Sequence, residues 1–109
     1  MISGKEILAK RLTEARKRIK NKDGSEKYSQ TGLGVAAGLD PSSASSRINH
    51  YETGRHSPDF LFVRKLAAVL DIPTCYMYAE EDELAELIAL YSDLSATNKR
   101  KLLKFAKGL

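Results

Sequence analysis

Helix start and stop signals follow one another at short intervals in the middle of the chain. Ser29 is a good N-cap for a short helix that runs through Ala37, and Gly38 is placed to end that helix in a left-handed conformation. Asp40 and Pro41 repeat the start signal, because Asp caps helices and Pro favours the first helical position. The pattern predicts two helices joined by a tight turn, and we expect the second helix to begin at Asp40.

The second predicted helix has one apolar face. Ala44, Ile48 and Tyr51 recur at helical spacing, and Gly54 closes the helix. With Ile48 at the centre of this inner face and a rotation of about 100° per residue, the opposite face is short and polar. Ser46 and His50 lie nearly opposite Ile48, and other polar residues lie close by or on the flanks: Ser42, Ser43, Arg47, Asn49 and Thr53.

Helices are also predicted before this pair. The spacing of Ser3 and Glu6 is that of a capping box, which predicts a first helix with an apolar stripe and a basic outer face. The stripe consists of Leu8, Leu12, Ala15 and Ile19. The polar segment 21–26 follows and is predicted to be a solvent-exposed loop.

Three further helices are predicted after Gly54. Ser57-Pro58-Asp59 starts one whose buried stripe is Val63, Leu66, Ala67 and Leu70, and Pro73 ends it. Residues 80–91 form the next, with Leu84, Leu87, Ile88 and Tyr91 on one face and acidic residues in its first turn. Ser95 caps the last, whose apolar side is Leu102, Leu103, Ala106 and Leu109. No segment alternates like a strand, so an all-α fold is expected.

The length of 109 residues allows one compact core and is too short for two. We expect a helical domain over residues 1–79 and a C-terminal helical extension over residues 80–109, which could pack on the domain or form a dimer. The positive charge gathers at the N-terminal end, where residues 1–27 carry a net charge of +5. A basic helix of this kind can attract phosphates, although it can also be an ordinary solvated face.

The sole cysteine, Cys75, cannot form an intramolecular disulfide, and the chain opens without the apolar stretch of a signal peptide or membrane helix. We therefore expect a cytoplasmic protein without a membrane partner. Because Cys75 lies among Ile72, Pro73, Tyr76 and Met77, it is expected to be a buried structural thiol. No metal-ligand spacing, nucleophile motif or cofactor loop accompanies Cys75 or the two histidines, so neither an enzyme, a cofactor nor a small-molecule ligand is expected.

Several linked elements of the central segment resemble the phage-repressor-type (Cro/C1, Xre) helix-turn-helix family. They are Ser29-Gln30, Ala37-Gly38-Leu39, Ile48-Asn49-His50-Tyr51-Glu52 and Gly54-Arg55-His56-Ser57-Pro58, in the family's order. The resemblance covers about residues 5–79. It implies a five-helix, lambda-repressor-like DNA-binding domain, here with an additional C-terminal helix. Such a domain is expected to bind double-stranded DNA and to regulate transcription as a repressor.

The polar face of the second helix suits this role, because a helix in the major groove needs one face against its own domain and the other toward bases. The expected base contacts are Gln30, Ser42, Ser43, Ser46, Arg47, Asn49 and His50. Arg47 could pair with guanine, and Asn49 or Gln30 with adenine. The resemblance places phosphate contacts at Ser29, Thr53, Arg55 and His56, with Gln30 also in a matching place, and Arg16 and Arg18 as possible additions.

The chain departs from the family pattern at two places. The stretch between Gly38 and Ile48 is roughly four residues longer, which is about one helical turn. These residues either lengthen the recognition helix at its start, as we expect, or loop out, in which case Ser42 and Ser43 lose their role. The loop before Ser29 is also longer, and its Lys20, Lys22 and Lys27 could reach the DNA backbone.

Two identical recognition helices about 34 Å apart can read a palindrome, so a homodimer is expected, with its interface in the C-terminal extension. The alternative is an antitoxin-like or other protein-interaction module, because a fold alone does not fix a function.

Overall fold

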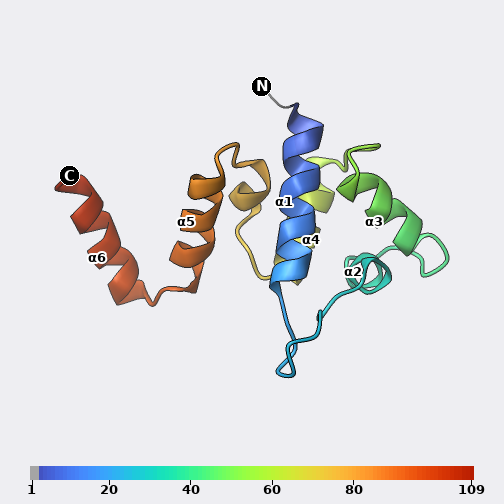
Figure 1. The fold of residues 1–109 in the computed structure, drawn as a ribbon, viewed down its shortest axis with the longest axis horizontal. Coiled ribbons are helices and arrows are strands. Elements are labelled where there is room, and N and C mark those ends of the chain that lie inside the picture. The colour runs from blue at the N-terminus through green and yellow to red at the C-terminus, as the bar shows by residue number, and fades with distance from the viewer. Residues whose placement is uncertain (1–2) are drawn as a thin grey trace.

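The computed structural model describes residues 3–109 and confirms the expected all-α class (Figure 1). Six α-helices and one 3₁₀-helix, and no strand, occur within this range. In chain order they are α1 (Gly4–Arg18), α2 (Gln30–Ala36), α3 (Ala44–Glu52), α4 (Phe60–Val69), η1 (Thr74–Tyr78), α5 (Asp82–Asp93) and α6 (Ala96–Lys107). Helix α1 lies centrally, with α2 and α3 to one side and α5 and then α6 to the other (Figure 1).

Helix α1 begins at the predicted capping box. The Ser3 Oγ accepts from the Glu6 amide at 3.2 Å, and the Ser3 amide donates to the Glu6 carboxylate at 3.4 Å. The predicted stripe on α1 is buried in the shared core at Leu8, Leu12 and Ala15, while Ile19 packs at its edge. The other core members come from α2, α3, α4, η1 and α5, so one apolar core unites these elements.

Two further predicted helix starts are confirmed by cap hydrogen bonds. Ser29 accepts from the Gly32 amide at 2.9 Å, and Ser95 accepts from the Asn98 amide at 3.1 Å. The start of α4 differs by two residues: Asp59, rather than Ser57, is the N-cap, and it accepts from the Phe62 amide at 2.8 Å. The predicted stripe of α4 is buried, and the segment 20–27 is an exposed loop closed by an antiparallel bridge between Lys20 and Glu26.

The prediction that Cys75 is buried is wrong. Residues 74–78 form the 3₁₀-helix η1, in which Tyr76 and Met77 face the core and Cys75 is exposed. A 3₁₀-helix has about three residues per turn, so neighbours in sequence point in different directions and an apolar run cannot be buried as a whole.

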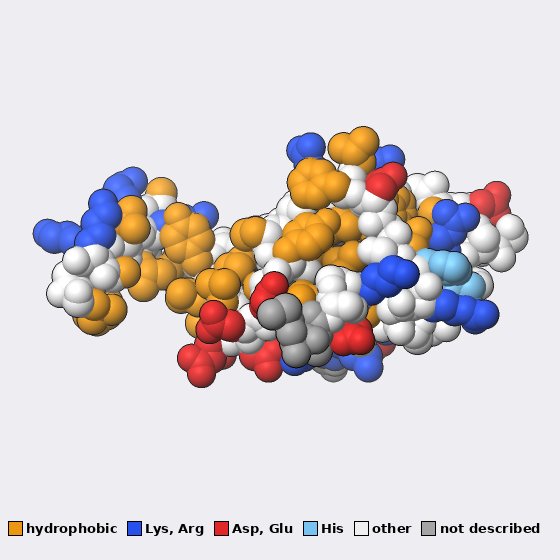
Figure 2. Space-filling view, turned by 90° about the horizontal axis from the view of Figure 1, so that it is seen from above, with side chains coloured by type: hydrophobic (Ala, Val, Ile, Leu, Met, Phe, Trp, Pro, Cys, Tyr) orange, Lys and Arg blue, Asp and Glu red, His pale blue; other side chains and the backbone are white. Residues whose placement is uncertain are grey.

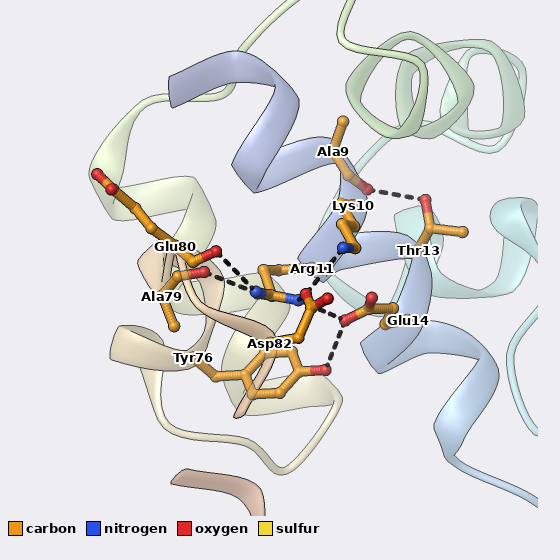
Figure 3. A network of polar contacts seen from close by, with 9 residues as sticks. All are labelled: Ala9, Lys10, Arg11, Thr13, Glu14, Tyr76, Ala79, Glu80 and Asp82. Atoms are coloured by element: carbon orange, nitrogen blue, oxygen red, sulfur yellow. Dashed lines mark hydrogen bonds and ion pairs between the residues drawn. The ribbon is translucent and has the colours of Figure 1, made fainter. Parts of the chain in front are cut away.

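A buried arginine joins α1 to the chain that leads into α5 (Figure 3). The Arg11 side chain is 2% exposed, and its Nε donates to the Ala79 carbonyl at 2.8 Å. Its Nη1 donates to both Glu14 and Asp82 at 3.0 Å, and Lys10 reaches the same Asp82 oxygen at 2.8 Å. Burial opposes the charge of Arg11, but the hydrogen bonds to the two carboxylates outweigh it, so the pKa of Arg11 is raised. The network fixes the start of α5 against α1.

Helix α5 turns its small residues toward the core. Ala85 and Ala89 are buried, whereas the predicted apolar stripe is largely exposed: Leu84, Leu87, Ile88 and Tyr91, of which only Ile88 is half-buried. The helix also begins at Asp82 rather than Glu80, because Glu80 and Glu81 remain extended beside the Arg11 network. Helix α6 buries no residue. The C-terminal extension therefore does not pack its main apolar faces on the domain.

None of the helices within residues 3–109 combines the length and apolar character needed to cross a bilayer.

Candidate nucleic-acid interface

Helices α2 and α3 pack at very close range. A Cβ atom placed on Gly34 would lie 2.8 Å from the Ala44 Cβ and 3.2 Å from its backbone, so only glycine fits there. A glycine inside a helix costs about 1 kcal/mol relative to alanine, and such a residue often marks a close backbone approach. Gly34 was not among the residues predicted to be important, although a glycine inside a predicted helix is itself a signal of close backbone approach. This contact sets the distance between the two helices.

The turn after α2 forms as predicted, around a left-handed glycine. Gly38 has φ +101°, and the Leu39 amide donates to the Gly34 carbonyl at 2.9 Å. The Gly38 amide also donates to the Val35 carbonyl, at 3.0 Å. The two hydrogen bonds satisfy carbonyls at the end of α2, and the left-handed glycine redirects the chain toward α3.

The prediction that α3 begins at Asp40 is wrong, because the additional residues lengthen the turn. The Asp40 carboxylate accepts from the amide and the hydroxyl of Ser42, at 2.8 and 2.6 Å, and thereby closes a local turn instead of capping a helix. These hydrogen bonds lower the pKa of Asp40. Helix α3 begins at Ala44 with Ser43 as its N-cap residue, so Ser42 and Ser43 lie outside the helix.

The faces of α3 agree with the helical-wheel prediction. Ala44, Ile48 and Tyr51 are buried, while Ser46, Arg47 and Asn49 are exposed and His50 is half-buried. The helix therefore presents a polar ridge to solvent and is held to the domain by its opposite side.

A polar network joins α1, α2 and α3 at one edge of this ridge. Arg16 and Glu52 form a bidentate ion pair, with Nε and Nη2 at 2.6 and 3.0 Å from the two carboxylate oxygens. Their side chains are 8% and 5% exposed. Gln30 donates to Glu52 at 3.2 Å and to Asn49 at 3.3 Å. The hydrogen bonds from Arg16 to Glu52 raise the pKa of Arg16 against the effect of burial.

This network brings Gln30 and Asn49, both predicted base contacts, to the same point. It also assigns Arg16 to the interior, so Arg16 is not available as an additional phosphate contact, and Arg18 is paired with Asp93 at 2.8 Å. The bidentate pair was missed by sequence analysis, because no local pattern links two residues that lie so far apart in the chain.

A basic cluster lies around the C-terminal half of α3 and the residues that follow it (Figure 2). It consists of Arg47, His50, Arg55 and His56. The two rings meet edge to face with centroids 5.1 Å apart, and the amides of Arg55 and His56 both donate to the His50 carbonyl. Partial desolvation, and then the charges of Arg55 and His56, lower the pKa of His50. Arg55 and His56 are exposed, and the Thr53 hydroxyl donates to the Asn49 carbonyl at 2.9 Å.

The lysines of the loop before α2 are exposed at Lys20, Lys22 and Lys27. The acidic residues of the loop are engaged elsewhere, since Asp23 accepts from Ser25 and Glu26 lies 3.5 Å from Arg16. No group of three or more His, Cys, Asp or Glu side chains within residues 3–109 could hold a metal ion.

Comparison with known proteins adds evidence from a solved structure. No protein-family model matches the sequence, and no curated protein does. The crystal structure of the transcriptional regulator BswR superimposes with a TM-score of 0.83 at 44% sequence identity, over 93% of each chain. The chain belongs to the same family as BswR. The residues outside the matched region are fewer than the twelve residues of α5 or of α6. Each of these C-terminal helices therefore lies at least partly within the region that the two structures share.

Proposed function

We propose that this chain is a sequence-specific, double-stranded DNA-binding transcriptional regulator of the phage-repressor type, with α3 as its recognition helix. The observation that carries the proposal is the polar ridge of α3, exposed opposite the buried Ala44, Ile48 and Tyr51 and joined to Gln30 of α2. A helix with these two faces can enter the major groove while its other side remains packed on the domain. The likeness to the transcriptional regulator BswR supports a regulatory role.

The proposed base-reading side chains are Gln30, Ser46, Arg47, Asn49 and His50. Arg47 can donate two hydrogen bonds to guanine, and the amides of Asn49 and Gln30 suit adenine. The lowered pKa of His50 favours its neutral ring, and a neutral imidazole has one donor and one acceptor nitrogen, so it can meet either kind of base edge. Ser42 and Ser43 are not carried into this set, because both contact Asp40 in the turn before α3 and neither lies within the helix.

The proposed phosphate contacts flank the base-reading residues. Ser29 lies at the start of α2, and Thr53, Arg55 and His56 lie at and after the end of α3. Exposed basic and hydroxyl groups at the start of α2 and at the end of the reading helix can fix the position of that helix on the duplex. Arg55 carries the permanent charge in this group, so it should contribute the most to sequence-independent affinity.

The functional unit is proposed to be a homodimer on a palindromic operator. One nine-residue helix reads only a few base pairs, whereas two copies related by a two-fold axis read two half-sites about one DNA turn apart. An operator that overlaps a promoter would be covered by such a dimer, which would repress transcription.

A protein-interaction role, as in antitoxin-like proteins, is the second candidate. The exposed apolar faces of α5 and α6 favour it, since such surfaces commonly mark contacts between proteins. The two candidates differ in their response to salt. Binding to DNA releases counterions, so DNA affinity falls steeply as salt rises, whereas apolar binding between proteins does not.

Selection of bound duplexes from random DNA, followed by titration of the selected site at several salt concentrations, tests the proposal. We expect an enriched palindrome with half-sites about 34 Å apart and an affinity that falls steeply with salt. The absence of enrichment, together with an affinity for DNA that does not respond to salt, would refute DNA recognition and favour the second candidate.

A further inference from the structure

Helix α6 is a helix without a partner. None of its twelve residues is buried, and it lies at the far end of the molecule beyond α5 (Figure 1). Isolated helices of this length are marginal in water, because most helical stability in proteins comes from packing of an apolar face. The apolar side chains of α6 are nevertheless large, and Leu103 and Phe105 are 55% and 67% exposed. A contact absent from the single chain is therefore expected to cover this helix.

An apolar groove of about 430 Å³ separates α6 from α5. Its α5 wall is the stripe that the sequence predicted, and its α6 wall is formed by Leu102, Leu103 and Ala106. Pro73 and the exposed Cys75 complete the lining. Orange side chains accordingly gather between the basic end of the molecule and its body (Figure 2). Because α6 of the same chain already forms one wall, it cannot also fill the space.

The two helices that form the walls of the groove carry opposite net charges. Helix α6 contains five basic residues and no acidic one: Lys99, Arg100, Lys101, Lys104 and Lys107. Residues 80–93 contain six acidic residues and no basic one: Glu80, Glu81, Asp82, Glu83, Glu86 and Asp93. Asp82 and Asp93 form ion pairs with α1, whereas the ion pairs found within residues 3–109 include none for the four glutamates or for any base of α6.

We propose that a second copy of this chain fills the groove, with α6 of each copy lying along α5 of the other. This inference rests on the homodimer of the proposed function and names its surface. A two-fold interface brings the same patch of both copies together, so it must be complementary to itself. The α5–α6 hairpin meets this condition twice, since its apolar walls match each other and its basic helix matches its acidic helix. A partner of uniform charge would match only one of the two helices.

Charge reversal at the groove tests the pairing. Glu83 lies one turn before Leu87, and Glu80 lies in the extended segment just before α5, while Arg100 and Lys107 lie one turn to either side of Leu103. The variants are therefore Glu80→Lys/Glu83→Lys on the α5 side and Arg100→Glu/Lys107→Glu on the α6 side. Lys101→Glu/Lys104→Glu is the matched control, because it reverses two charges on the face of α6 that does not line the groove. Circular dichroism verifies that every variant is folded.

Sedimentation equilibrium at low salt provides the first measurement. The wild type and the control should be dimers. The dissociation constant of the dimer should be at least about tenfold higher for each groove variant alone. An equimolar mixture of the two groove variants should recover the dimer, because each reversed helix then faces a reversed partner. Failure of the mixture to recover a dimer would overturn the pairing. A dimer that persists in both variants would place the interface elsewhere and leave the proposed function intact.

The single thiol offers a second measurement that needs no mutation. Cys75 lines the groove and is the only cysteine, so its alkylation rate should fall as the concentration of the wild-type chain rises through the dimer range. A rate that is low at every concentration would mean that the chain closes the groove by itself, which would overturn the inference. A wild type that remains monomeric both free and on its selected DNA site would overturn the dimer and its surface together, while leaving DNA binding by α3 intact.

Discussion

At the scale of single residues, the Arg16–Glu52 ion pair connects the reading surface to the core. Both side chains are almost fully withdrawn from water, so the loss of Glu52 leaves Arg16 buried with only the exposed Glu26, at 3.5 Å, as a charge partner. The Glu52→Gln variant should therefore lower the free energy of unfolding by about 3–5 kcal/mol in urea denaturation.

Glu26→Gln is a matched control for that change. Glu26 also faces Arg16, at 3.5 Å, but its side chain is exposed, and removal of an exposed charge partner costs less than about 1 kcal/mol. Equal losses in the two variants would mean that the Arg16–Glu52 pair has no special role in stability.

Arg55 is the clearest test of a phosphate contact. Arg55→Ala should weaken binding to all DNA sequences alike and reduce the salt slope by about one, because one fewer counterion is released per site. Arg64→Ala serves as the control, since Arg64 is an exposed arginine of α4 and lies outside the proposed interface. A loss confined to the selected operator would refute the assignment of Arg55 to phosphate.

Asp82 makes the attachment of α5 sensitive to acid. Hydrogen bonds from Lys10 and then Arg11 lower its pKa in the folded chain. A lowered folded pKa means that the contribution to stability is fully present above the unfolded pKa of about 3.9 and is lost as the pH falls through the lower folded value. Urea denaturation across this acidic range should show a smaller pH dependence for Asp82→Asn than for the wild type. An unchanged dependence would contradict the role of this carboxylate.

At the scale of elements, the contact between α2 and α3 is limited by Gly34. Gly34→Ala would place a methyl group 2.8 Å from the Ala44 Cβ, and overpacking of this kind costs about 1–3 kcal/mol. The gain in helix propensity, about 1 kcal/mol, offsets only part of that cost. We expect a lower Tm and weaker binding to the operator, because α3 must move relative to Gln30.

The double variant Gly34→Ala/Ala44→Gly returns the missing space and should recover part of the operator affinity. If the second substitution instead added its full cost to the first, the two residues would not be coupled, and the close approach would not be what positions α3.

Local signals were sufficient to predict most elements. The cap residues Ser3, Ser29 and Ser95 and the turn at Gly38 rest on hydrogen bonds between near neighbours, so they could be predicted from sequence. The start of α3 was predicted wrongly because Asp and Pro favour a local turn as well as a helix start, and the Ser42 hydroxyl decides between the two.

Long-range packing was beyond the sequence patterns. The apolar stripe of α5 is real, but a periodic pattern does not state which surface it will meet, and here the small Ala85 and Ala89 face the core instead. The same limit applies to the proposed site: the exposed face of α3 followed from periodicity, whereas the contact of Gln30 with Asn49 and Glu52 required the fold.

At the scale of the whole molecule, α3 lies toward one end of a body 51 Å long, and the helices α5 and α6, whose side chains line the apolar groove, lie toward the other (Figure 1). Pairing through α5 and α6 would leave α3 of each copy free to meet DNA. The proposed division of labour is therefore a dimer formed at one end of the chain and DNA read at the other.

The central claim, that α3 reads the bases, is tested most directly by Ser46→Ala/His50→Ala. Both side chains lie on the polar ridge and neither belongs to the core, so the variant should remain folded. Its affinity for the selected operator is predicted to fall to that for a scrambled duplex, with non-specific binding largely retained. A variant that still preferred the operator to the scrambled duplex as strongly as the wild type does would contradict the assignment of α3 as the recognition helix.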